Sequence, residues 1–232
     1  MSQVVSTIFL AVVLLVVTLA GDSKEDISMS VFAVVDGGEG SGTTTLSHRL
    51  HAHFPKSIRT REPGGSRLGE ELRGLILRPD AAAYDAETMF AAFWAARRDH
   101  MREIIMPARK QGLMVFTDRF DSSTWAYQIR GQKQSQLADL FWAVRAHYLK
   151  DCAPDMYIVL DVPPEIGVAR AKSRGGEITH FDLAEMDFHR RVRAGFLEFV
   201  HDPRTTQRQA VVDATKTQDH VFAEVVAFIE AH

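Results

Sequence analysis

A glycine-rich segment is the first place where this sequence could do chemistry. Glycines let successive backbone N–H groups curl around phosphate oxygens, and a following helix adds partial positive charge. The full phosphate-loop pattern is G-x-x-x-x-G-K-[S/T], and the glycines at both ends and the final hydroxyl match it. Taken alone, the segment could also be an ordinary glycine-rich turn between a strand and a helix. The segment reads Gly37-Gly38-Glu39-Gly40-Ser41-Gly42-Thr43-Thr44-Thr45.

Two further segments place charged side chains after short apolar runs. Thr60 to Gly65 reads Thr-Arg-Glu-Pro-Gly-Gly, and Asp118 with Arg119 follows a run that begins at Leu113. A carboxylate at a strand end suits the ligand shell of Mg²⁺, to which Thr44 would add its hydroxyl. A guanidinium fork matches phosphate oxygens in a bidentate way, so Arg119 is a candidate phosphate ligand.

The order and spacing of these motifs closely resemble bacterial-type thymidylate kinases, from Val31 to the C-terminus. The resemblance implies transfer of the γ-phosphoryl group of ATP to dTMP with Mg²⁺, which feeds dTTP synthesis. It also implies a P-loop NTPase fold and a homodimer. The matching motifs are the glycine-rich loop, Thr60-Arg61-Glu62-Pro63-Gly64-Gly65, Phe93-Trp94-Ala95-Ala96-Arg97, and Asp118-Arg119-Phe120-Asp121-Ser122-Ser123-Thr124-Trp125-Ala126-Tyr127-Gln128.

The resemblance assigns roles to these residues. Residues 37–45 would hold ATP, and Thr44 and Asp118 would hold Mg²⁺. Phe93 would stack on the thymine ring, and Arg97, four residues later on the same helix face, would bond its carbonyl. The remaining dTMP contacts would come from Glu39 (at the 3′-hydroxyl), Arg61, Arg119, Ser123, Thr124, Tyr127 and Gln128.

A basic helix end resembles the start of the family's lid, which closes over ATP and brings cations to the transferring phosphate. Lys172 and Arg174 precede two glycines there, and we expect them to act with Arg119 and Arg61 in catalysis. After the glycines the family reads Asp-Arg-aromatic, whereas this chain reads Thr179-His180-Phe181. The lid is therefore poorer in arginine than the resemblance predicts.

Position 43 is the larger departure, because a threonine stands where the pattern has lysine. Loss of one donor aimed at developing charge costs on the order of 10²–10³ in rate. The sequence thus predicts ATP binding with slow turnover, which Thr43→Lys would raise by about 10- to 1000-fold. Two alternatives stay open: a lid cation fills the role, or the protein is a catalytically silent nucleotide binder. A kinase for another nucleotide, such as dUMP, is a third reading of the site.

Short apolar runs that each end at an aspartate alternate with helical patterns. Runs of this kind are typical of strands buried on both faces of a parallel sheet. We therefore expect one three-layer α/β domain with about five strands, the number being that of the family, and a ligand site beyond their carboxyl ends. The runs are Val31 to Val35, Leu113 to Phe116, Met156 to Leu160 and Ala210 to Val212.

Composition narrows the class of protein. The chain has 232 residues and a formal net charge of −3, which argues against a general nucleic-acid binder. It has one cysteine, Cys152, so an internal disulfide cannot form and a reducing, cytoplasmic setting fits best.

The N-terminus has a different composition. No charged side chain occurs from Met1 to Gly21, and Val4 to Leu19 is almost entirely apolar. Three readings stay open: a start placed too early, a membrane anchor or a cleaved targeting segment. Residues 1–28 are therefore expected to form an extension, with the folded domain over residues 29–232.

Overall fold

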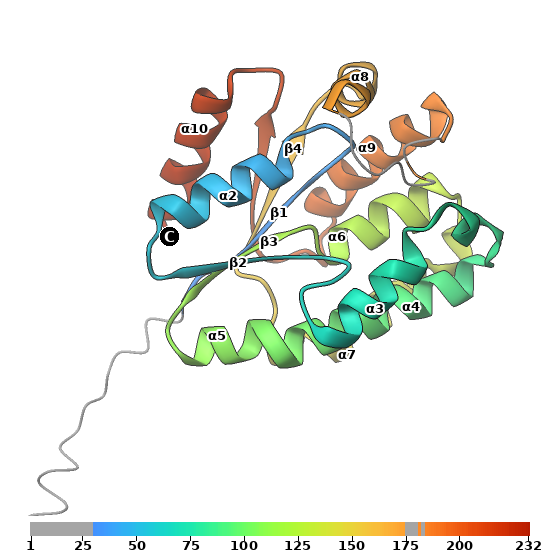
Figure 1. Ribbon diagram of the computed structural model, residues 1–232, viewed down its shortest axis with the longest axis horizontal. Coiled ribbons are helices and arrows are strands. Elements are labelled where there is room, and N and C mark those ends of the chain that lie inside the picture. The colour runs from blue at the N-terminus through green and yellow to red at the C-terminus, as the bar shows by residue number, and fades with distance from the viewer. Residues whose placement is uncertain (1–29, 175–180, 182–183) are drawn as a thin grey trace, which may run out of the picture.

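Five parallel strands form one sheet at the centre of the protein (Figure 1). The structure, a computed structural model, describes residues 30–174, 181 and 184–232. The sheet order is β2-β3-β1-β4-β5, with every neighbouring pair parallel. The strands are β1 (Phe32–Gly37), β2 (Ser57–Arg61), β3 (Met114–Asp118), β4 (Met156–Asp161) and β5 (Arg208–Asp213).

Helices cover both faces of this sheet, so the three-layer α/β architecture is confirmed. Figure 1 shows α2 and α10 on one side and α4, α5 and α7 on the other, with α3 packed along α4. The longer helices are α2 (Thr43–His53), α3 (Arg67–Ile76), α4 (Ala86–His100), α5 (Met106–Lys110), α7 (Ala138–Leu149), α8 (Pro164–Arg174), α9 (Met186–His201) and α10 (Gln218–Glu230). The other helical segments are α6 (Asp121–Ser123), two 3₁₀ turns (Pro79–Ala83, Ser135–Leu137) and two π-helical segments (Met101–Ile105, Thr124–Gly131).

Strand β1 shows why the apolar runs form a sheet buried on both faces. All six of its residues are buried. Ala33 and Val35 pack in the cluster with α2 and α10, while Phe32 and Val34 pack in the cluster with α4, α7 and α9. Alternate side chains point to opposite faces of a strand, so a continuous apolar run supplies both cores.

Helix α4 does not run straight on into α5. A π-helical turn at Met101–Ile105 separates α4 from α5, and Pro107 lies in the first turn of α5. Proline has no amide hydrogen to donate, so it interrupts the hydrogen-bond ladder where the π-helical turn passes into α5.

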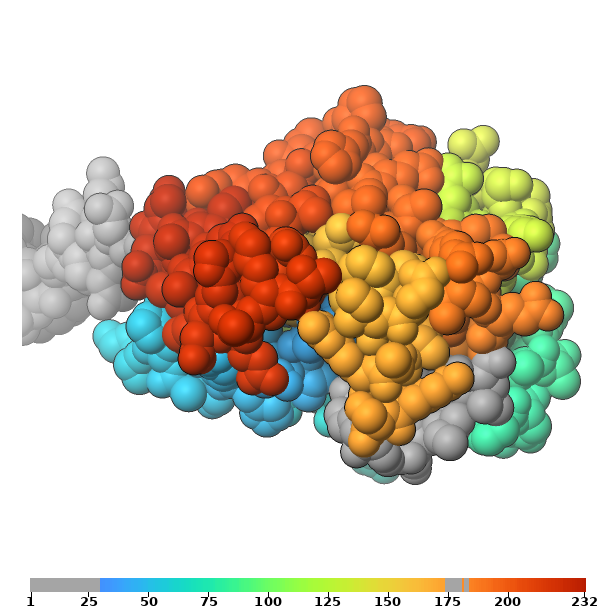
Figure 2. Space-filling model, turned by 90° about the horizontal axis from the view of Figure 1, so that it is seen from above, coloured from blue at the N-terminus to red at the C-terminus, as the bar shows by residue number. Residues whose placement is uncertain are grey.

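At the surface, α8 lies between α10 and α9 (Figure 2). Glu165 in its first turn pairs with Arg190 of α9 at 2.8 Å. Among the described residues no helix is long and apolar enough to cross a membrane. Residues 1–29 lie outside the described part of the chain.

We expect a chain that starts at Met29 to fold as the full chain does. The first strand begins at Phe32, and the core is built from residues that follow it. The two chains should show the same unfolding temperature in a thermal scan. Aggregation or a marked loss of stability in the shorter chain would mean that the removed segment packs on the domain.

Candidate active site

The glycine-rich loop joins β1 to α2 in a shape that glycines make possible. Gly40 has φ +64°, and a β-carbon there would lie 2.0 Å from the carbonyl oxygen of Gly167. Gly42 has φ +100° and occupies the N-cap of α2 without a side chain to cap it. No side chain of the N-cap residue therefore occupies the first amides of α2, which leaves them available to bind an anion.

Thr44 and Asp118 meet at the start of α2. The Thr44 hydroxyl donates to Asp118 Oδ2 at 2.6 Å, which joins α2 to the end of β3. Asp118 Oδ1 is buried and has no hydrogen-bond partner in the described part of the chain. A hydroxyl beside an unsatisfied carboxylate oxygen fits Mg²⁺, which takes one or two carboxylates and completes its shell with phosphates and water.

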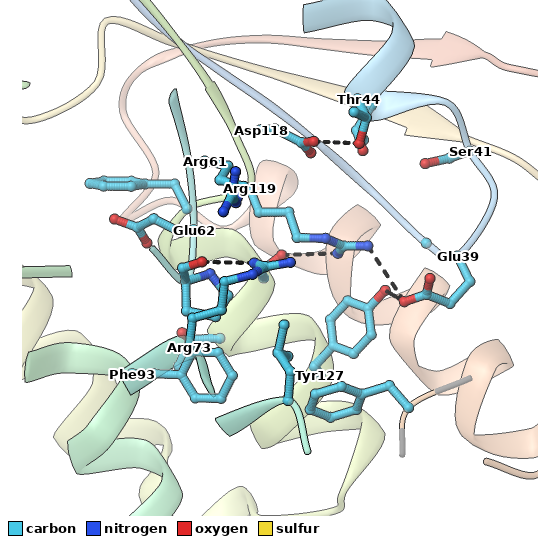
Figure 3. Close-up of a pocket in the computed structure, with 18 of the residues that line it drawn as sticks. Glu39, Ser41, Thr44, Arg61, Glu62, Arg73, Phe93, Asp118, Arg119 and Tyr127 are labelled. Atoms are coloured by element: carbon cyan, nitrogen blue, oxygen red, sulfur yellow. Dashed lines mark hydrogen bonds and ion pairs between the residues drawn. The ribbon is translucent and has the colours of Figure 1, made fainter. Parts of the chain in front are cut away.

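A cavity of about 510 Å³ extends from this loop to α4 (Figure 3). Its walls come from the loop and the start of α2, from β2 and the turn after it, from α3 and α4, and from the segment after β3, with Phe181 beside them. It is lined by Gly38, Glu39, Gly40, Ser41, Gly42, Thr43, Thr44, Thr45, His48, Arg59, Arg61, Glu62, Pro63, Arg73, Leu77, Phe93, Arg97, Asp118, Arg119, Phe120, Ser123, Thr124, Tyr127, Gln128 and Phe181.

Arg119 crosses the middle of this cavity toward Glu39 (Figure 3). Its Nη2 lies 3.5 Å from Glu39 Oε1, which also accepts the Tyr127 hydroxyl at 2.8 Å. Burial alone lowers the pKa of Arg119, but Tyr127, Glu39 and the nearby aspartates raise it above its ordinary value. Arg119 is therefore a permanent positive charge between the loop and the far wall.

Asp36 supports the segment that carries Arg119. It is fully buried and accepts the hydroxyls of Ser122 at 2.7 Å and Ser123 at 2.8 Å. Burial raises the pKa of Asp36 to about 6, although Arg119 and both serines act to lower it. Asp36 thus anchors the start of the segment after β3 to the end of β1.

Arg97 lies buried in the opposite wall, where Glu62 fixes it. Its Nε donates to Glu62 Oε2 at 2.7 Å and its Nη2 to the Phe120 carbonyl at 2.9 Å. His100 holds the other oxygen of Glu62 at 2.9 Å. Arg97 Nη1 is buried without a partner among the described residues, as are both side-chain polar atoms of Gln128. A buried unpaired donor is costly, so the wall suits a ligand that offers a carbonyl oxygen.

Comparison with known proteins decides which family uses this arrangement. The sequence model of the thymidylate kinase family matches residues 35–225. Thymidylate kinases of Bacillus cereus strain Q1 and Bacillus anthracis are each 36% identical over 205 residues, which cover 86% of this chain and 97% of theirs. The chain belongs to the thymidylate kinase family. The crystal structure of thymidylate kinase from Ehrlichia chaffeensis superposes with a TM-score of 0.67 at 29% identity, over 86% of this chain and 98% of that one.

Most residues that the sequence assigned to a thymidylate kinase site do line the one cavity. Gly37 lies just outside the lining, and its carbonyl accepts from Arg119 Nη1 at 3.2 Å. Lys172 is exposed on α8 and does not line the cavity. The Arg174 side chain and the lid residues up to His180 lie outside the described part of the chain.

Several residues of the site received no role from the sequence, among them Glu62, His100 and Arg73. Glu62 stands inside the motif after β2 and His100 lies three residues after Arg97, so both could have been found by helix and motif spacing. Arg73 donates to the Pro63 carbonyl at 2.8 Å and lines the cavity, and burial lowers its pKa. It lies on an amphipathic helix where an arginine normally faces solvent.

We expect Glu62→Gln to destabilise the protein by about 3–5 kcal/mol, because it leaves Arg97 as an uncompensated buried charge. The two side chains are only 4% and 1% exposed. Denaturant unfolding measures the free energy of unfolding. Glu71→Gln is the matched control, since it loosens a surface pair with Arg67 and should cost about 0–1 kcal/mol. Equal costs for the two variants would contradict the proposed importance of the buried pair.

Proposed function

We propose that this thymidylate kinase family member transfers the γ-phosphoryl group of ATP to dTMP, giving ADP and dTDP. The observation that carries the proposal is the continuous cavity from the phosphate loop to the unpaired Nη1 of Arg97. Two substrates placed at its two ends would meet in the middle, where Arg119 lies. Family membership favours this reaction over the dUMP kinase and the silent nucleotide binder.

The transfer needs no covalent intermediate. An oxygen of the dTMP phosphate attacks the γ-phosphorus, the bond from that phosphorus to the bridging oxygen breaks, and the electron pair stays on the β-phosphate of ADP. The protein mainly positions groups and stabilises charge in such a reaction. The amides of the first turn of α2 hold the donor phosphates, and Arg119 draws the acceptor phosphate toward them.

Arg61 is proposed as a second ligand of the acceptor phosphate. It makes a forked pair with Glu70 of α3, at 2.9 and 3.0 Å, on the cavity wall. The Gly65 amide bonds Glu70 and lowers its pKa, with Arg61 adding to the effect. The pair keeps Arg61 at the end of β2, directly opposite Asp118 in the strand register.

Thr44 and Asp118 are the residues proposed to hold Mg²⁺. When bound, the ion neutralises charge on the donor phosphates. The described residues contain no group of three or more histidine, cysteine, aspartate or glutamate side chains that could hold a metal without help. Binding would therefore depend on the phosphates of ATP, which is the usual mode for Mg²⁺ in kinases.

The acceptor base is proposed to lie between Phe93 and Arg97. Phe93 is half-buried one turn before Arg97 on α4, so its ring can stack on a base whose carbonyl meets Arg97 Nη1. Gln128 offers a second donor and acceptor on the same wall. Glu39 and Tyr127 would receive the sugar hydroxyl, with Ser123 and Thr124 completing the acceptor site.

The donor base is proposed to occupy a second hollow of about 470 Å³ on the other side of the loop. Its walls come from the loop, α2, α8 and the turn before α10, and they include Thr45, Arg170 and Gln218. Arg170 donates to the Ala214 carbonyl at 2.8 Å and so joins α8 to the segment after β5. Lys172 and Arg174, two and four residues further along α8, remain proposals as lid cations.

A homodimer working in the cytoplasm completes the proposal. Leu68 and Leu75 of α3 are 43% and 48% exposed, which supports a protein contact at this helix. Light scattering on the purified protein tests the dimer. Fractionation of cells that express the full chain, compared with a chain from Met29, tests whether residues 1–28 change the location.

A coupled assay with ATP, Mg²⁺ and a panel of acceptor nucleotides tests the function. We expect ADP release that depends on dTMP, with dTMP used in preference to dUMP and dCMP. ATP binding without dTMP-dependent turnover would favour the silent nucleotide binder instead.

A further inference from the structure

Thr43 leaves the phosphate site without the lysine of the standard loop. Its side chain is buried, 7% exposed, at the start of α2. A threonine there can contribute an uncharged hydroxyl but no fixed positive charge near the β- and γ-phosphates. A kinase of ordinary speed needs another residue to supply that charge, because the loss of one such donor costs on the order of 10²–10³ in rate.

Five arginines line the cavity, and four of them already have partners. Arg61 is forked on Glu70, Arg73 bonds the Pro63 carbonyl, Arg97 is paired with Glu62, and Arg119 bonds the Gly37 carbonyl and approaches Glu39. Arg59 is the fifth. It is half-buried and makes no hydrogen bond or ion pair with any described residue.

The strand register fixes the direction in which Arg59 points. In β2 it stands opposite Phe116 of β3, which packs with Leu46 and Leu50 of α2. Thr60, the next residue, bonds His100 of α4 on the other face of the sheet, at 2.6 Å. Because side chains alternate along a strand, Arg59 faces α2.

On this face of the sheet, Arg59 can reach the start of α2, where the phosphates would bind. Thr44, Thr45 and His48 share the cavity wall with it. The strand end, where Asp118 meets Thr44, is two residues further along, or roughly 6.6 Å. An extended arginine side chain covers that distance, and Arg59 forms no ion pair with a described carboxylate.

Three other cationic side chains near the loop, within the described part of the chain, are less suited to the role. Lys172 is exposed and lies outside the cavity wall, and Arg170 is bonded to the Ala214 carbonyl at the second hollow. His48 lines the cavity, but an imidazole lacks the permanent charge of a guanidinium.

We propose that Arg59 supplies to the β- and γ-phosphates the positive charge that a lysine at position 43 supplies in the standard phosphate loop. The charged side chain comes from β2 instead of from the loop itself. A planar guanidinium can bond two phosphate oxygens at once, so it can replace a lysine from a different direction. The inference rests on the proposed phosphoryl transfer and explains how this chain carries it out with Thr43.

A double-mutant comparison tests the substitution of one charge by the other. Single-turnover rates with ATP, Mg²⁺ and dTMP are measured for the wild type, Arg59→Ala, Thr43→Lys and the double variant. We expect Arg59→Ala to slow transfer by about 10²–10³. Thr43→Lys should change the wild-type rate little, yet restore most of the rate in the double variant. Arg59→Lys should keep more activity than Arg59→Ala.

The same four proteins are compared by their affinity for ADP, Mg²⁺ and aluminium fluoride together with dTMP, a mimic of the transition state. That affinity should follow the rates, while affinity for ADP and Mg²⁺ alone changes less. Arg67→Ala, at a 96% exposed arginine of α3, is the matched control and should change neither quantity. Unfolding temperatures separate a loss of charge from a loss of structure.

Three results would overturn the assignment of Arg59: wild-type behaviour of Arg59→Ala, failure of Thr43→Lys to rescue it, or a 10- to 1000-fold gain from Thr43→Lys alone. The last would mean that the charge is missing in the wild type. A wild type without dTMP-dependent turnover would instead overturn the proposed function, and the affinity series would still decide the role of Arg59.

Discussion

Arg119→Ala is expected to lower kcat/KM for every acceptor nucleotide by about 10²–10³, the cost of one preorganised charged donor. Arg119 lies between the phosphate loop and the base wall, and its neighbours keep it charged. It would bond the acceptor phosphate, which dTMP, dUMP and dCMP share. Kinetics with the three nucleotides should therefore show parallel losses.

The backbone at this position helps to isolate the side chain. Arg119 has φ +71°, a strained value for any residue with a β-carbon. Alanine carries the same strain, so the variant removes the guanidinium and leaves the backbone cost unchanged. Arg119→Lys is the control: it keeps the charge but loses the fork, and it should recover part of the rate. A loss confined to one acceptor would contradict a phosphate-binding role.

Strands β1, β3 and β4 could be read from the sequence because they are buried on both faces and form apolar runs that end at an aspartate. The run at β5 also predicted a strand, but β5 lies at an edge of the sheet and most of its residues are not buried, so burial on both faces was the wrong expectation for it. Strand β2 carries Arg59 and Arg61 and lies at the edge of the sheet, where one side is open. An edge strand can hold charged residues, so its composition resembles a loop.

The site could be read from motifs but not from single contacts. The cavity gathers the glycine-rich loop, the segment after β2, α4 and the segment after β3, as the resemblance predicted. Arg59 escaped notice because its role depends on the register of β2 against β3 and on the missing lysine. Contacts between residues far apart in sequence, such as Thr60 with His100, carry no local signal.

Arg97→Ala is expected to weaken use of dTMP and to reduce the preference for thymine over cytosine. A hydrogen bond from a charged group contributes about 1.5–3 kcal/mol, so kcat/KM for dTMP should fall by about 10- to 150-fold. Thymine offers a carbonyl where cytosine has an amino group. The loss should therefore be large for dTMP and dUMP and small for dCMP. Steady-state kinetics with all three nucleotides measure it.

Ratios of kcat/KM are the right readout because this variant also leaves the buried Glu62 carboxylate without its partner. Lost folded protein lowers all three values alike and leaves their ratios unchanged. The control is Arg97→Ala combined with Glu62→Gln. It removes the unpaired buried carboxylate, so it should show the same ratios of kcat/KM and a higher stability than Arg97→Ala alone. An unchanged ranking of dTMP and dCMP in both variants would show that Arg97 does not read the base.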